Sequence, residues 1–136
     1  MPLPSESAEV PELLGTWDLV AYEDRDAADG PWTRPFGTPT GHILYARSGG
    51  LSVQVVPGPD APSGAVEIGY VGTFEVADSE RQGATVRGVV LHQMRTASDE
   101  SLFADDPQRP FELTGDELVL GDGTTWRRTL LRRTRH

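Results

Sequence analysis

The sequence has a Gly-x-Trp motif near its start and a cluster of arginines at its end, and together these can close one end of a small β-barrel. Gly15 and Trp17 open the first run of strand-forming residues, and arginines crowd the last ten residues. In a small antiparallel barrel the first strand pairs with the last, so an indole can plug the base while a guanidinium stacks across it. Either Arg132 or Arg133 can supply that guanidinium, because the sequence leaves the strand register open. A plugged eight-stranded barrel is a cup with room for one small ligand.

The terminal arginines also allow a second interpretation, an anion-binding patch. The cluster consists of Arg127, Arg128, Arg132, Arg133 and Arg135. A strand sends alternate side chains to opposite faces, which scatters such a cluster. We therefore favour arginines that pair with acidic neighbours and with the Trp17 plug. Antiparallel pairing places the other end of this strand, with Trp126 and Arg128, near Tyr22 at the mouth.

Composition and charge exclude several classes of function. The chain has 136 residues, a net charge of −9 and no cysteine, and all 12 basic residues are arginine. Such an acidic chain argues against nucleic-acid or anionic-membrane partners, and it has no thiolates for disulfides or metal sites. The segment 1–6 does not resemble a signal peptide, and no apolar run reaches membrane-spanning length. We expect a cytoplasmic protein with one domain over residues 1–136, either a monomer or a homodimer.

The spacing of turn signals predicts an all-β fold, an eight-stranded antiparallel up-and-down barrel. The expected strands cover about 15–24, 41–46, 50–56, 67–77, 84–95, 109–114, 117–121 and 124–134. Gly-rich and Asp-rich turns separate them at 47–50, 78–83, 114–116 and 121–123. Upstream, Ser5 or Ser7 can cap a short helix over 5–14 that Pro11 limits to one or two turns. We expect this helix to lie across the closed end.

Three connections are longer than hairpins require, at 25–40, 57–65 and 97–109. They carry Trp32, Phe36 and Phe103, which are costly to leave in solvated loops. Long loops on a compact barrel are either lids or irregular surface segments, and these aromatic residues favour loops that fold onto the mouth.

Several stretches, in chain order, resemble the bacterial lipocalin-like domain family of calycin-type barrels. They are 14–23 (LGTWDLVAYE), 35–37 (PFG), 40–45 (TGHILY), 49–54 (GGLSVQ), 69–76 (GYVGTFEV), 111–113 (FEL) and 116–118 (DEL). The resemblance implies an eight-stranded lipocalin-like barrel with a central cavity. Members include carriers and small cofactor-free enzymes that cyclise natural-product intermediates, so the resemblance implies a pocket without fixing the reaction.

Four residues are the candidates for donors or proton shuttles: His92, Tyr70, Tyr45 and Arg128. His92 shares the more apolar face of its strand with Val86, Val90 and Met94, so we expect that face to point inward. The alternatives are a histidine at the rim, or one whose hydrogen bonds are satisfied by a neighbouring strand. Tyr45 lies inside or outside according to its strand's orientation. Arg128 could polarise a carbonyl or hold a carboxylate.

A second group is predicted to contact the ligand directly. It comprises Tyr22, Phe36, Gln54, Phe74, Val90, Met94, Phe103 and Trp126. Gln54 alternates with Val53 and Val55, which normally means solvent, yet a cup needs polar groups to orient its ligand. Gly72, between Tyr70 and Phe74, either makes room for a ligand or marks a sharp bend.

The sequence contains no motif of a stronger chemistry, and we expect neither a cofactor nor a metal. The three histidines lack metal-ligand spacing, and there is no nucleophile elbow, P-loop or dinucleotide fingerprint. The favoured hypothesis is a cofactor-independent cyclase or isomerase that encloses a polyketide-type intermediate. One alternative is a non-catalytic carrier of a small apolar ligand. Another is an interaction module whose barrel is filled by its own side chains.

Overall fold

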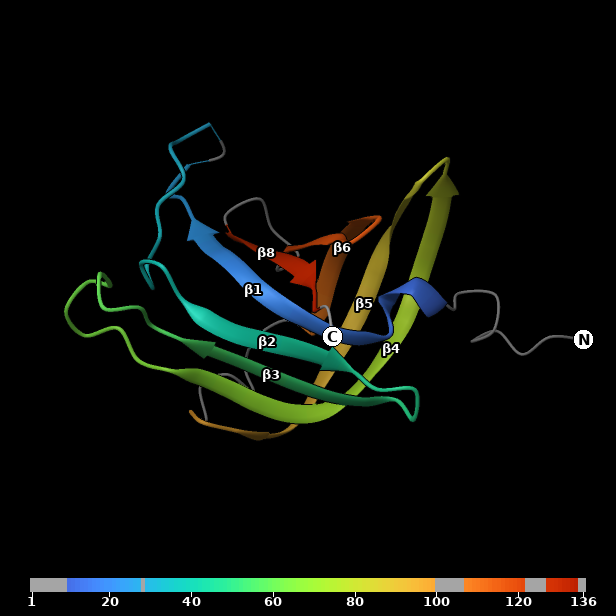
Figure 1. The fold of residues 1–136 in the computed structure, drawn as a ribbon, viewed down its shortest axis with the longest axis horizontal. Helices are drawn as coiled ribbons and strands as arrows, with labels where there is room; N and C mark the ends of the chain where they lie inside the picture. The colour runs from blue at the N-terminus through green and yellow to red at the C-terminus, as the bar shows by residue number, and fades with distance from the viewer. Residues whose placement is uncertain (1–9, 28, 100–106, 122–126, 135–136) are drawn as a thin grey trace, which may run out of the picture.

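The chain folds into a closed barrel of eight antiparallel strands in up-and-down order, as predicted (Figure 1). This computed structural model describes residues 10–27, 29–99, 107–121 and 127–134. The strands are β1 (Gly15–Asp24), β2 (Thr40–Tyr45), β3 (Gly50–Val56), β4 (Ile68–Gln82), β5 (Thr85–Ala97), β6 (Gln108–Thr114), β7 (Glu117–Gly121) and β8 (Arg127–Arg133). Pairing of β1 with β8 closes the sheet and leaves neither strand as an open edge. Within the described ranges, no helix is long and apolar enough to cross a membrane.

The expected N-terminal helix over 5–14 is wrong for the part that is described. Only a single 3-10 turn, η1 (Pro11–Leu13), forms there, and residues 5–9 lie outside the described residues. Its two hydrogen bonds run from Leu13 N–H to Val10 O and from Leu14 N–H to Pro11 O. No side chain caps the turn, and proline at its first position has no amide hydrogen to donate. Fully buried Leu13 anchors the turn against the base of the barrel.

The turn predicted at 78–83 is also wrong, because β4 continues through it to Gln82. The polar residues Asp78 to Gln82 pair with β5 along a hairpin that extends beyond its neighbours in Figure 1. The reversal falls at Gly83, whose φ of +59° suits glycine. Polar side chains suit this part of the hairpin because most of them are exposed there.

Gly72 marks a close approach of two strands. The β4–β5 register shifts between Val71 and Gly72, and a Cβ at Gly72 would overlap the carbonyl oxygen of Gln93. Of the two interpretations of this glycine, the structure therefore supports the bend, since a bulge sharpens the local twist of the sheet.

The closed end has the predicted indole plug. Trp17 is fully buried, and its Nε1 donates to Leu13 O at 2.9 Å. Arg133 supplies the guanidinium, with its Cζ 4.3 Å from the indole centroid and a bond from Nη1 to Leu14 O at 3.1 Å. Arg132 is exposed and lies opposite Asp18 in the β1–β8 ladder. The plug arginine is therefore Arg133.

Inward and outward faces follow the alternation expected from the sequence. Val86, Val90 and His92 are buried on β5, as predicted, and Val53 and Val55 are buried on β3. These side chains belong to an interior that is largely continuous from the plug at Trp17 to the middle of the barrel.

Candidate functional site

Three of the predicted site residues meet inside the barrel in one hydrogen-bonded row. The hydroxyl of Tyr45 lies 2.6 Å from Nε2 of His92, and the hydroxyl of Tyr70 lies 2.8 Å from Nδ1 of the same ring. Tyr45 comes from β2, Tyr70 from β4 and His92 from β5, so three different strands build this Tyr45–His92–Tyr70 array. The open question about Tyr45 is settled, because it points inward with buried Ile43 two residues before it.

The array is buried, and burial decides its protonation. His92 is only 2% exposed, and burial, followed by the positive charge of Arg109, lowers the pKa of its imidazole to about 3. The ring is therefore neutral at pH 7. Burial, followed by the neighbouring Tyr70, raises the pKa of Tyr45 well above its usual range, so this phenol keeps its proton.

A neutral imidazole between two phenols can form its two hydrogen bonds in only two arrangements. One ring nitrogen carries a proton and donates, and the other accepts. One tyrosine must therefore donate to the ring, while the other accepts from it and directs its own O–H elsewhere. The two tautomers differ only in which tyrosine plays which role.

Aromatic packing holds the array in place. Tyr45 contacts Phe74 edge to face, with ring centroids 4.8 Å apart. Phe74 itself pairs with His92 in the β4–β5 ladder. The predicted contact residues Phe74, Val90 and Met94 thus belong to the wall around the array, with Val90 fully buried and the other two partly buried.

Arg109 is a site residue that the sequence interpretation missed. It pairs with buried Val90 in the β5–β6 ladder, and it alternates with buried Phe111 and Leu113 along β6. Cross-strand partners share a face of the sheet, so Arg109 belongs to the interior face near the mouth. Its positive charge adds to the effect of burial on the pKa of His92, since both lower it. For Tyr45 the same charge opposes burial, which raises the pKa of the phenol. The alternation of Arg109 with Phe111 and Leu113 was a readable signal for this placement.

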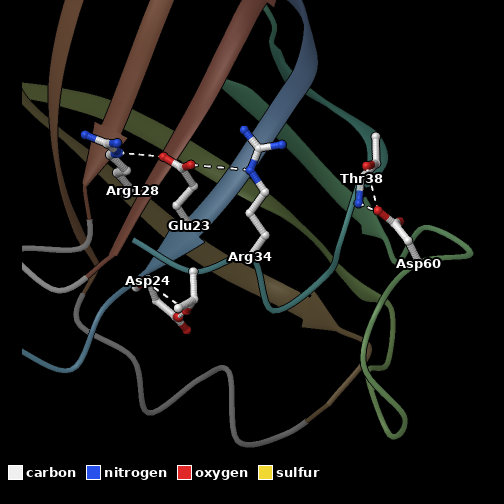
Figure 2. Close-up of polar contacts among 7 residues, drawn as sticks. Glu23, Asp24, Arg34, Thr38, Asp60 and Arg128 are labelled. Carbon is white, nitrogen blue, oxygen red and sulfur yellow. Dashed lines mark hydrogen bonds and ion pairs between the residues drawn. The ribbon is translucent and has the colours of Figure 1, made fainter. Parts of the chain in front are cut away.

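Arg128, the fourth predicted donor, lies in a different environment (Figure 2). Its Nε donates to Glu23 Oε1 at 2.8 Å, as Figure 2 shows. Its Cζ also stacks 4.0 Å from the centroid of Trp32. Arg34 approaches the other carboxylate oxygen of Glu23 at 3.4 Å. The structure therefore places Arg128 in a mouth cluster of Glu23, Arg34, Trp32 and Arg128, not in the array.

A β-bulge explains this placement. The β1–β8 register shifts between Leu19 and Ala21, which leaves Val20 as an extra residue and sets Glu23 opposite Arg128. On β8, Thr129 lies opposite buried Leu120, so its neighbour Arg128 points away from that interior. The same shift sets Tyr22 opposite Thr129, on the interior side.

The long loops fold onto the mouth as expected, where residues of the described part can be followed. Phe36 is buried and packs edge to face against Tyr22, with centroids 4.9 Å apart. Thr38 donates to both oxygens of Asp60, from its amide and from its hydroxyl, each at 2.8 Å (Figure 2). These bonds lower the pKa of the Asp60 carboxyl and tie the two loops together.

Three of the remaining predicted contacts are outside the interior or outside the described residues. Gln54 lies on the outer face, where its Nε2 donates to Glu67 Oε1 at 2.7 Å, because Val53 and Val55 take the inward positions. The side chain of Gln54 does not point into the barrel, and its contact with a ligand stays a prediction. Phe103 and Trp126 lie outside the described residues.

Pockets lined by described residues include one of about 400 Å³ that Tyr70 of the array lines together with Val53 and Ala97. A second, of about 450 Å³, covers the outer face at Thr40, His42 and Gln54. Another, of about 360 Å³, lies between Val10, Leu14 and Val76 near the closed end. Within the described ranges, no group of three His, Asp or Glu side chains is arranged to hold a metal ion.

Comparisons with protein-family models, with curated proteins and with solved structures find no match to this chain. The closed eight-stranded barrel is compatible with the calycin-type fold that the resemblance implies. Membership of the lipocalin-like family stays a prediction.

Proposed function

We propose that the barrel binds one small, largely apolar molecule on the mouth side of the array and promotes its cyclisation or isomerisation without a cofactor. The observation that carries this proposal is the neutral imidazole of His92 held between two phenols inside an apolar barrel. A polyketide-type intermediate, with carbonyl oxygens along a flexible carbon chain, is the substrate class in keeping with the lipocalin-like resemblance.

The array suits hydrogen-bond donation better than full proton transfer. Tyr70 is 8% exposed whereas Tyr45 is fully buried, so Tyr70 is the better candidate to face the ligand. In that arrangement Tyr45 donates to Nε2 of His92, Nδ1–H donates to Tyr70, and the Tyr70 hydroxyl donates to a ligand carbonyl. Each bond in such a row polarises the next. Negative charge that develops on the carbonyl oxygen is thereby stabilised in a site of low dielectric constant.

His92 accordingly has a positioning and polarising role in this proposal. With a pKa of about 3 the ring is not protonated at neutral pH, so it does not begin the reaction as an imidazolium acid. Complete transfer along the row would leave a phenolate at Tyr45, whose raised pKa opposes that state. Holding the substrate in a reactive conformation and excluding water then contributes the rest of the rate enhancement.

A carrier is the second candidate, and the burial of the array favours it. Tyr45 and His92 are closed off from solvent and stay neutral, so the array can also serve as a fixed polar contact that holds a carbonyl without changing it. The carrier and the enzyme differ in turnover alone.

Turnover by defined variants tests the proposal. Linear polyketide-type substrates with conjugated carbonyls are incubated with the protein, and products are separated by mass spectrometry. Tyr70→Phe removes the donor but keeps the ring, and we expect a loss of about 10²–10³ in kcat. His92→Gln should act similarly, whereas His42→Gln, on the outer pocket, is the matched control. Undiminished turnover in both array variants contradicts the assignment, and retention of intact ligand by the wild type identifies a carrier.

A further inference from the structure

The pocket near the closed end of the barrel lies where three segments of the chain meet. It has a volume of about 360 Å³ and is lined by residues in and beside η1, in the turn between β2 and β3, and in β4. An ion pair between Arg81 of β4 and Glu12 of η1 fastens the long β4–β5 hairpin to η1 (Figure 1). A volume of this size is within the range of small-molecule sites.

The wall of this closed-end pocket is mostly apolar. Val10 is buried there. Leu14, Phe74 and Val76 are only partly buried against the core, so they offer apolar surface that their neighbours do not fully cover. Covering such surface with an apolar group is favourable by about 25 cal/mol per Å². Phe74 also packs edge to face on Tyr45, with ring centroids 4.8 Å apart, so this one ring contacts both the pocket and the array.

Two side chains of opposite charge, Arg47 and Glu75, also line the pocket. Both are exposed, and neither forms an ion pair with the other or with another described residue. Arg47 lies two residues before Gly49, whose carbonyl oxygen accepts a hydrogen bond at 3.0 Å from the amide of Phe74, the residue before Glu75. A ligand that bridges the two would carry a carboxylate for the guanidinium and an ammonium group for the carboxylate.

We propose that the closed-end pocket binds a small zwitterion with an apolar end, of the class of the apolar α-amino acids. The apolar end packs on Phe74 and Val76, the carboxylate binds Arg47, and the ammonium group binds Glu75. The net charge of −9 disfavours a ligand that brings only a negative charge, whereas a zwitterion adds no net charge. This site is separate from the mouth-side space of the proposed function and does not depend on it.

Three ligands with one phenylethyl skeleton test the proposal. L-phenylalanine carries both charges, 3-phenylpropionate lacks the ammonium group, and 2-phenylethylamine lacks the carboxylate. Titrations followed by the NMR methyl signals of Leu14 and Val76 give a dissociation constant for each. We expect phenylalanine to bind about two- to fivefold more tightly than either of the others, the gain that one exposed ion pair supplies. Phenylalanine binding that is no tighter than that of the other two contradicts the proposal.

Two variants assign the charges. Arg47→Gln should weaken phenylalanine and 3-phenylpropionate by the same factor and leave 2-phenylethylamine unchanged, whereas Glu75→Gln should weaken phenylalanine and 2-phenylethylamine. Arg95→Gln and Glu80→Gln are matched controls, because they remove exposed charges of β5 and β4 that do not line the pocket. Equal effects of a variant and its control, or ligand-induced shifts at Val56 of the outer face in place of Leu14 and Val76, overturn the inference. Either failure leaves the proposed function standing, since none of the substituted residues belongs to the array.

Discussion

Two arginines of β8 stack on two tryptophans, one at each end of the barrel. Arg133 lies 4.3 Å from the centroid of Trp17, and Arg128 lies 4.0 Å from the centroid of Trp32. The contact distances are nearly equal, but the surroundings differ. Trp17 is a fully buried strand residue, whereas Trp32 belongs to a loop, is half-buried and has Arg25 stacked on it as well.

The partners of the two guanidiniums show what the difference means. Arg133 donates to backbone carbonyls, Leu14 O at 3.1 Å and Glu12 O at 2.5 Å, so it ties the chain before β1 to the last strand. Arg128 binds the side chain of Glu23, which Arg34 of the loop shares. The closed end is thus part of the core, while the mouth cluster fastens a loop. Similar cation–π geometry therefore stabilises the whole fold at one end and positions a covering segment at the other.

The largest expected contrast is between the two tryptophans. Trp17→Ala should lower the free energy of unfolding by about 3–5 kcal/mol, because it removes a fully buried indole from the core. Trp32→Ala should lower it by about 1 kcal/mol or less, since its indole packs in a half-exposed loop. Urea denaturation followed by circular dichroism measures both. Equal losses would mean that the mouth loop is as integral to the fold as the plug.

The pH dependence of stability tests whether the array is closed off from solvent in the folded protein, in contrast to the half-exposed mouth cluster. His92 titrates near 6.5 when unfolded and at about 3 when folded, so the unfolded state binds more protons between these values. Stability should therefore fall as pH falls through this window, with a contribution from His92 of up to about 1.4 kcal/mol per pH unit. His92→Gln should show a shallower slope above pH 4.5, where carboxylates add little. Identical slopes would show that His92 is accessible to protons in the folded state.

Glu23 tests whether the mouth cluster acts locally. Glu23→Gln should lower the free energy of unfolding by about 1–2 kcal/mol, because two arginines lose their shared carboxylate. Hydrogen exchange should accelerate most at the amides of Asp24 and Thr33, which bond to each other's carbonyl oxygens where the loop meets β1. Glu112→Gln, which removes an exposed partner of Arg87, is the control and should change stability by less than about 0.5 kcal/mol. Uniform acceleration across all eight strands would contradict a local role.

The smallest effects should come from the arginines themselves. Arg133→Lys should cost about 1 kcal/mol, because lysine keeps the charge over Trp17 but cannot bond two carbonyls with one planar fork. Arg128→Lys should cost about 0.5 kcal/mol, since its head group is more exposed. Thermal unfolding of both variants beside the wild type measures the difference. A larger loss in Arg128→Lys would reverse the ranking of the two ends.

Predictions that depended on a single strand were confirmed, whereas a prediction that depended on the pairing of two distant strands was not. The inward placement of Val90 and His92 followed from alternation along a single strand, and so did the outward position that alternation favoured for Gln54. Arg128 was expected to face the ligand because it lies near Tyr22 in a simple antiparallel pairing. The bulge at Val20 changes that pairing, and a valine at this position does not indicate a bulge. Arg109 was overlooked because charged residues in a strand usually face solvent, although its alternation with Phe111 was visible.

The amino-acid sequence by itself determined the all-β class, the up-and-down order of the strands, the indole plug and the inward faces. These features depend on the two-residue period of a strand and on turn residues a few positions apart, which act locally. Only the tertiary structure decided that Arg133 covers Trp17, that Tyr45 and Tyr70 meet at His92, and that Glu23 draws Arg128 away from the interior. Each of these contacts joins residues far apart in the chain, and their partners depend on strand register and bulges, which the closed barrel settles as a whole.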